Sequence, residues 1–149
     1  MRWVAGLSDV VLGDDRELQR QAAFLAELTA SQNVYLIRKL GRRRIPPIYQ
    51  SGVVYRADPV EWDMPHPDLR VQYFPTADAA FERKWVDCKG AAPWRVADLR
   101  LENPHRVANP ESAYFCTTYV RRSRGQVLVH LLVQLPTGEI EDPSRFLHQ

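Results

Sequence analysis

The sequence lacks the short motifs that mark several large enzyme classes. It has no glycine-rich phosphate loop, no Gly-x-Ser-x-Gly turn and no internal repeat. These absences argue against a P-loop nucleotide hydrolase, an α/β-hydrolase and a repeat protein. The spacing of metal ligands is also missing, because His66, His105 and His148 have no second ligand at the spacing of a metal site. We therefore expect neither a metal nor a cofactor.

Long apolar runs and strong charge are missing as well. No stretch reaches the roughly 18 apolar residues of a membrane span, and the first residues lack the apolar core of a signal peptide. The formal net charge is only +2, so the composition does not demand a nucleic-acid partner. One basic run, Arg42-Arg43-Arg44, is interpreted as a solvated loop, with contact to DNA or an acidic neighbour as the alternative.

Cysteine is scarce, with two residues, Cys88 and Cys116, in 149. Cys116 lies in a β-rich run, where a small buried thiol is common. We predict that both are free thiols in a chain made in a reducing cytoplasm.

The length and a hydrophobic content of 45% suit a single domain, residues 1–149. Residues 1–44 are predicted to be an N-terminal helical segment, and residues 45–149 the core. A capping box at 14–17 predicts a helix to about residue 30, packed on the core rather than binding a partner. Residues 33–40 either continue it or form a second helix that ends at Gly41. The expected apolar stripe is Leu18, Ala22 and Leu25, flanked by Phe24 and Leu28.

A hairpin is predicted near the C-terminus. Residues 126–135 are mostly aliphatic, and the next three, Pro136-Thr137-Gly138, suit a three-residue loop that ends in a glycine of positive φ. This loop pairs Leu135 with Glu139. With residues 113–121, the two arms make an antiparallel sheet of about 113–121, 126–135 and 139–142.

The register of this hairpin brings two polar side chains together. Counting back from the loop sets Leu132 opposite Asp142, and His130 lies on the same face because side chains alternate. Asp142 is then diagonal to His130 and within reach of it. A core histidine with a local hydrogen bond is the alternative interpretation of His130.

Cys88 can supply a third group. Ala92, Val96 and Leu99 recur at helical spacing after it, which places Cys88 at, or just before, the start of a helix. Pro93 favours a start near Gly90, which would leave Cys88 in the preceding turn. Backbone N–H groups at a helix start and a neighbouring imidazolium both favour a thiolate. The order Cys, His, Asp is that of a thiol triad.

Several stretches carry a family resemblance. They are Asp87-Cys88, the segment from Ala91 to Arg100, Val129-His130-Leu131-Leu132-Val133, and Gly138-Glu139-Ile140-Glu141-Asp142-Pro143-Ser144. Together they resemble the transglutaminase-like, papain-like cysteine peptidase superfamily. More narrowly they resemble its small members from tailed bacteriophages, which also have a stretch similar to residues 49–56. The resemblance covers about residues 45–147.

The resemblance implies an α+β fold, with a papain-like or transglutaminase-like core in which a Cys-bearing helix packs on a small antiparallel sheet. It implies Cys88 as nucleophile, His130 as base and Asp142 as the group that orients the histidine. The expected activity is hydrolysis of an amide bond, in a peptide or a peptidoglycan cross-bridge, through a thioester. Transglutamination shares that intermediate and stays open.

The alternative comes from another class of protein. A structural virion component, at the head-to-tail junction or in the tail, would keep the fold as a non-catalytic module and contact other virion proteins. In either case we expect a chain made in the host cytoplasm, with incorporation into the virion as a further possibility.

Overall fold

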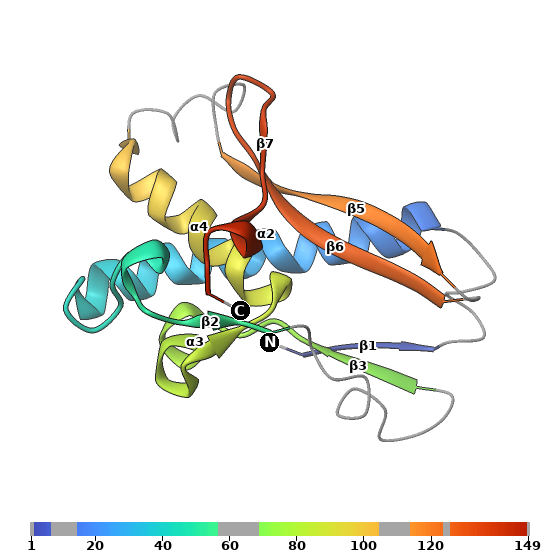
Figure 1. Cartoon of the computed structure of the whole chain (residues 1–149), viewed down its shortest axis with the longest axis horizontal. Coiled ribbons are helices and arrows are strands. Elements are labelled where there is room, and N and C mark those ends of the chain that lie inside the picture. Colours follow the sequence, from blue (N-terminus) through green and yellow to red (C-terminus); the bar gives the residue numbers. More distant parts are fainter. Residues whose placement is uncertain (1, 7–14, 57–68, 105–113, 124–125, 149) are drawn as a thin grey trace.

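A computed structural model of the chain describes residues 2–6, 15–56, 69–104, 114–123 and 126–148 (Figure 1). The predictions for His66 and His105 lie outside these residues. The described part is a mixed α+β structure, which agrees with the predicted class. Its helices are α2 (Asp15–Leu40), α3 (Ala77–Arg83) and α4 (Cys88–Glu102), with short 3-10 turns η1 (Ile48–Gln50) and η4 (Pro143–Arg145). Its strands are β1 (Arg2–Gly6), β2 (Val54–Tyr55), β3 (Leu69–Tyr73), β4 (Trp85–Val86), β5 (Phe115–Ser123), β6 (Gln126–Gln134) and β7 (Ile140–Glu141).

The main sheet is antiparallel, in the order β5-β6-β7. This confirms the three predicted strands, with bounds shifted by one or two residues. Two small sheets were not predicted: β1 pairs antiparallel with β3, and β2 pairs parallel with β4. Helices α2 and α4 pack against each other and against β5 and β6 (Figure 1).

Helix α2 is one continuous helix of 26 residues, so the two predicted helical stretches are joined. The reason is local, because no Gly or Pro interrupts it before Gly41, whose φ of +86° ends the helix. The expected flanking residues do not face the core: Phe24 and Leu28 are exposed. The side chain of Leu18 lies outside the described ones. The buried line consists of small or polar residues, which permit close packing: Ala22, Ala26, Thr29, Ala30 and Asn33, with Ile37.

Helix α4 is the central element of the core, since its two sides belong to two clusters of buried side chains. Ala92 and Val96 pack with small residues of α2 and with Leu131 and Val133 of β6. Trp94 is fully buried in the second cluster, and its indole N–H donates to the Pro46 carbonyl at 3.2 Å. A displacement of α4 would therefore disturb both clusters.

The basic run is only partly a solvated loop. Arg43 and Arg44 are exposed as predicted, but Arg42 donates from Nη1 to Asp98 Oδ1 at 2.6 Å. Asp98 lies fully buried on α4 and also accepts from the Ile48 backbone N–H at 2.8 Å. A buried carboxylate needs such partners, and they lie 56 and 50 residues away in the sequence, so the sequence did not indicate them.

Among the helices that the structure describes, none combines the length and the apolar character needed to cross a bilayer.

Candidate active site

The C-terminal hairpin has the predicted register. Val133 pairs with Glu141 and Gln134 with Ile140. The Leu135 N–H donates to the Glu139 carbonyl at 2.9 Å, and Gly138 has a φ of +89°. Continuing this register sets residue 132 opposite residue 142. The three-residue loop therefore determines which side chains share a face of the strands.

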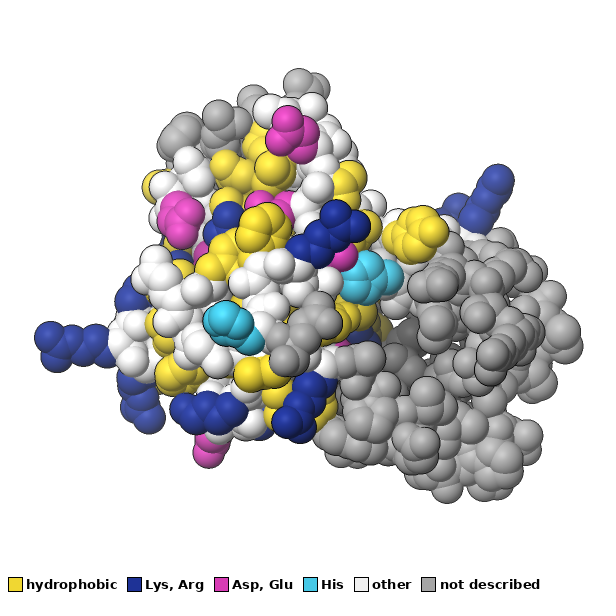
Figure 2. Space-filling model, viewed as in Figure 1, with side chains coloured by type: hydrophobic (Ala, Val, Ile, Leu, Met, Phe, Trp, Pro, Cys, Tyr) yellow, Lys and Arg dark blue, Asp and Glu magenta, His cyan; other side chains and the backbone are white. Residues whose placement is uncertain are grey.

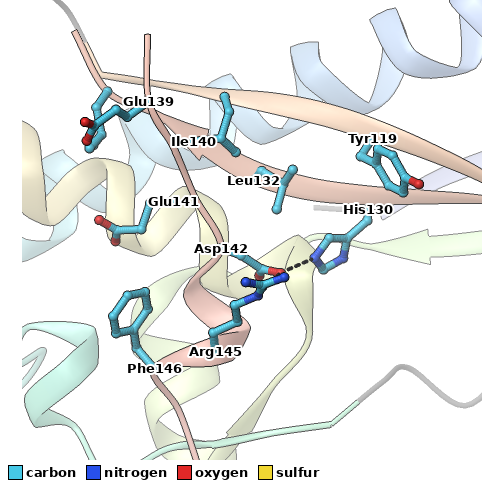
Figure 3. A pocket seen from close by; sticks show the side chains of 10 residues that line it. Tyr119, His130, Leu132, Glu139, Ile140, Glu141, Asp142, Arg145 and Phe146 are labelled. Atoms are coloured by element: carbon cyan, nitrogen blue, oxygen red, sulfur yellow. Dashed lines mark hydrogen bonds and ion pairs between the residues drawn. The ribbon is translucent and has the colours of Figure 1, made fainter. Parts of the chain in front are cut away.

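His130 and Asp142 are in contact, as the register predicts. His130 Nε2 lies 3.2 Å from Asp142 Oδ2 (Figure 3). Asp142 also caps η4, since its Oδ1 accepts from the Ser144 N–H at 3.1 Å and from the Ser144 hydroxyl at 2.8 Å. Partial burial acts to raise the pKa of Asp142, but the bonds from Ser144 and His130 outweigh it, and the net pKa is lowered. The carboxylate is therefore charged at neutral pH.

Cys88 is the first residue of α4, which confirms that it lies at the start of a helix and corrects the narrower prediction of a start near Gly90. The Asp87 side chain caps the helix and accepts from the N–H groups of Lys89 at 3.0 Å and Gly90 at 3.3 Å. This cap begins the helix two residues earlier than expected. Pro93 then lies inside the helix rather than in its first turn, and it is buried.

The thiol of Cys88 is neutral at neutral pH, contrary to the expected thiolate. Burial, followed by the negative charge of Asp87, raises its pKa to about 11. The Lys89 ammonium and the Leu131 backbone N–H act in the opposite direction but do not compensate. Lys89 is itself paired with Asp87, at 2.6 Å between Nζ and Oδ2. The helix start therefore supplies less stabilisation of a thiolate than desolvation removes.

The three predicted site residues lie in one region of the molecule. The Cys88 thiol lies close enough to the Leu131 N–H and to the Asp142 carboxylate for both to affect its pKa. Leu131 directly follows His130 on β6. Within the described residues, no hydrogen bond joins the thiol to the imidazole. Because Asp142 contacts Nε2, the ring nitrogen left for the thiol is Nδ1.

A second set of contacts, which sequence reasoning missed, attaches the hairpin to the Cys-bearing helix. Arg95 of α4 donates from Nε to Glu141 Oε1 at 2.7 Å, and the Tyr49 hydroxyl donates to the same oxygen at 2.5 Å. The Arg95 guanidinium also lies over the Tyr49 ring, 4.6 Å from its centroid. Glu141 directly precedes Asp142, so these contacts fix the position of Asp142 relative to α4.

A pocket of about 780 Å³ opens beside the His130–Asp142 pair (Figure 3). Its lining combines apolar and charged side chains from β5, β6, β7 and the C-terminal segment: Tyr119, His130, Leu132, Leu135, Glu139, Ile140, Glu141, Asp142, Arg145 and Phe146. Cys88 is not among them, because it lies beneath β6 against the first core cluster. The imidazole therefore lines the pocket, whereas the half-buried thiol packs against the core.

Gly90 permits the close packing of the first turn of α4. A methyl group at this position would lie 2.5 Å from Val86 Cγ2 and 2.8 Å from Pro75 Cγ. We therefore expect Gly90→Ala to lower the free energy of unfolding by about 1–3 kcal/mol, despite its better helix propensity. Urea unfolding followed by circular dichroism measures this change.

The control for Gly90→Ala removes the nearer of the two clashing groups. Val86→Ala deletes Cγ2, so the double variant should be less destabilised than the sum of the two single variants, by about 0.5–2 kcal/mol. Simple additivity would show that contact with Val86 is not the cause.

Both cysteines are free thiols, as predicted, and Cys116 is buried on β5. The described side chains include no group of three or more His, Cys, Asp or Glu that could hold a metal ion. What the site can do follows from a neutral thiol, an imidazole and a carboxylate, the set used for nucleophilic attack on a carbonyl. Comparison of the chain with protein-family models, with curated proteins and with solved structures gave no match.

Proposed function

We propose that the chain is a bacteriophage-encoded, transglutaminase-like thiol hydrolase that cleaves an amide bond through a thioester on Cys88. The observation that carries the proposal is the contact of 3.2 Å between His130 Nε2 and Asp142 Oδ2, on a hairpin attached to the helix that begins at Cys88. His130 is only partly buried, has a carboxylate partner and lines an open pocket, whereas a histidine that only fills the core needs one hydrogen bond.

The proposed reaction follows from these groups. His130 Nδ1 accepts the proton of the Cys88 thiol as Sγ attacks the carbonyl carbon of the amide. The C–N bond then breaks, and the amine leaves with the proton from His130. Water, deprotonated by His130, hydrolyses the thioester to a carboxylic acid and restores the thiol. An amine in place of water would give transamidation.

The charges in the site support this division of roles. A thiol with a pKa of about 11 is protonated at rest, so attack requires a base at the moment of reaction. Asp142 keeps its negative charge, since its pKa is lowered, and can stabilise the imidazolium that forms. The mechanism requires the Cys88 thiol to come within hydrogen-bond reach of Nδ1.

The direct test is to trap the thioester. The full-length protein is incubated with a pool of casein peptides or with soluble peptidoglycan fragments, quenched in acid and examined by intact-mass spectrometry. We expect a mass increase on Cys88 that hydroxylamine removes, together with new carboxyl termini in the substrate.

The matched control is Cys116→Ala, which removes the buried thiol on β5 and should leave the adduct unchanged. An adduct that maps to Cys116, or no adduct and no product from either substrate, would contradict the proposal.

One observation favours a structural virion component as the second candidate. Phe24, Leu28 and Tyr35 are exposed along one side of α2, at spacings that bring them onto a common stripe. Such a stripe suits burial against a neighbouring virion protein, and obligate interfaces of this kind commonly exceed about 2,000 Å². The two functions are compatible, because the stripe and the pocket are formed by different elements.

A further inference from the structure

The large apolar side chains that are exposed in the described structure fall into two groups. One is the stripe on α2. The other lies around the His130–Asp142 pair and consists of Phe115, Tyr119, Ile140 and Phe146. On the face of the molecule shown in Figure 2, apolar side chains reach the surface among charged ones, and histidine lies beside them.

The second group follows the geometry of the sheet. Tyr119 of β5 is the cross-strand partner of His130, and Gln134 pairs with both Phe115 of β5 and Ile140 of β7. Directly opposite residues point to the same face, so these side chains share the face of His130. No described helix covers it, since α2 and α4 pack with the side chains of the other face, Leu131 and Val133.

The pocket lies within this apolar face. Leu132 and Leu135 of the β6 arm and Ile140 of β7 line it, while Phe146 closes one end and is 62% exposed (Figure 3). A volume of about 780 Å³ lies within the range of ligand pockets and is large enough for a bulky side chain. Exposed apolar side chains around a pocket of this size gain most by contact with a bulky apolar group.

The charges of the pocket disfavour anionic ligands. Three carboxylates, Glu139, Glu141 and Asp142, line it against one guanidinium, that of Arg145. Glu141 is paired with Arg95, and Asp142 lies 3.9 Å from Arg145 Nε. Glu139 has no ion-pair partner among the described residues. Cell-wall stem peptides combine small side chains with several free carboxylates, so both their size and their charge fit this pocket poorly.

We infer that the pocket binds a protein segment with a large aliphatic or aromatic side chain next to the amide to be cleaved, rather than a peptidoglycan stem peptide. The inference rests on the proposed function, and it names the substrate class of the same site. The apolar side chain packs against Ile140 and Phe146, in the pocket that His130 also lines.

The test separates binding from catalysis by the use of Cys88→Ala. Fluorescently labelled peptides of equal length are titrated into this variant and followed by anisotropy. They carry a central Leu-Phe, Ala-Ala or Glu-Glu pair, and a soluble muropeptide serves as the fourth ligand. We expect the Leu-Phe peptide to bind at least about 10-fold more tightly than each of the others.

Two further substitutions locate the binding surface. Phe146→Ser in the Cys88→Ala protein should remove most of the preference for the Leu-Phe peptide. Phe24→Ser is the matched control, because Phe24 on α2 is 63% exposed, close to the 62% of Phe146, but lies outside the pocket. It should leave every affinity unchanged.

The outcomes also distinguish this inference from the proposed function. Equal affinities, tighter binding of the muropeptide, or loss of affinity in the Phe24→Ser protein would overturn the inference, even if the wild-type protein cleaves some of these ligands. Preferential binding of the Leu-Phe peptide through Phe146, with no cleavage by the wild-type protein, would support the pocket and refute the hydrolase.

Discussion

Cys88→Ala should reduce the cleavage rate by about 10⁴-fold or more. The remaining rate should be that of slow hydrolysis of the bound substrate without a nucleophile. The reason is chemical, since alanine offers no atom that can form the thioester. The substitution removes one half-buried sulfur at the first position of α4, and alanine is well tolerated there, so the fold should persist. Initial rates with the best peptide substrate, together with a urea unfolding curve, measure both effects.

The same experiment shows whether the three residues act as a unit. His130→Ala removes the base and should cost about 10²–10⁴-fold in rate. The double variant of Cys88 and His130 should be no slower than Cys88→Ala alone, because groups that act in one step are not additive. Multiplication of the two losses would instead indicate that His130 acts independently of the thiol. Cys88→Ala with wild-type activity would refute the triad altogether.

The hairpin could be predicted because local rules determine it. A three-residue loop that ends in Gly138 sets the register, and strand alternation then brings His130 and Asp142 onto one face. The sequence also contains a signal that Asp142 caps a turn. Asp followed by Pro143 is typical of the start of a helical turn, and it would have indicated Ser144 as a donor to the carboxylate.

The rest of the site depends on contacts between distant segments. Tyr49, Arg95 and Glu141 meet across 46 and 92 residues of sequence, and nothing local to any of them indicates the other two. The pairings of β1 with β3 and of β2 with β4 are non-local in the same way. The raised pKa of Cys88 was also missed, because desolvation depends on what packs over the helix start.

Asp98→Ala should be the most destabilising single substitution of those considered, at about 3–5 kcal/mol. It removes the fully buried carboxylate that accepts from both Arg42 and the Ile48 N–H, and it leaves that N–H without its acceptor. Since small domains are stable by only about 5–15 kcal/mol, much of the protein would then unfold at modest urea concentrations. Glu82→Ala, at an exposed position of α3, is the control and should change stability little.

Asp98→Asn should behave differently, and its effect should depend on pH. Burial raises the pKa of Asp98 to about 6, although the bonds from Ile48 and Arg42 act to lower it. In the unfolded chain the pKa of an aspartate is about 3.9. Between these values the folded protein holds a proton that the unfolded chain has lost. The stability that Asp98 contributes is therefore fully present below about pH 4 and is lost as the pH rises through about 6.

Asparagine keeps the shape and an acceptor for the Ile48 N–H but does not titrate. The free energy of unfolding of the wild type, minus that of Asp98→Asn, should therefore be highest at about pH 4, where both side chains are neutral in the folded state, and should fall as the pH rises to about 7. Urea unfolding of both proteins across this range, with all other carboxylates in common, isolates the contribution of Asp98. A value of this difference, wild type minus Asp98→Asn, that stays constant or rises with pH would mean that the ion pair with Arg42 outweighs burial and keeps Asp98 charged throughout.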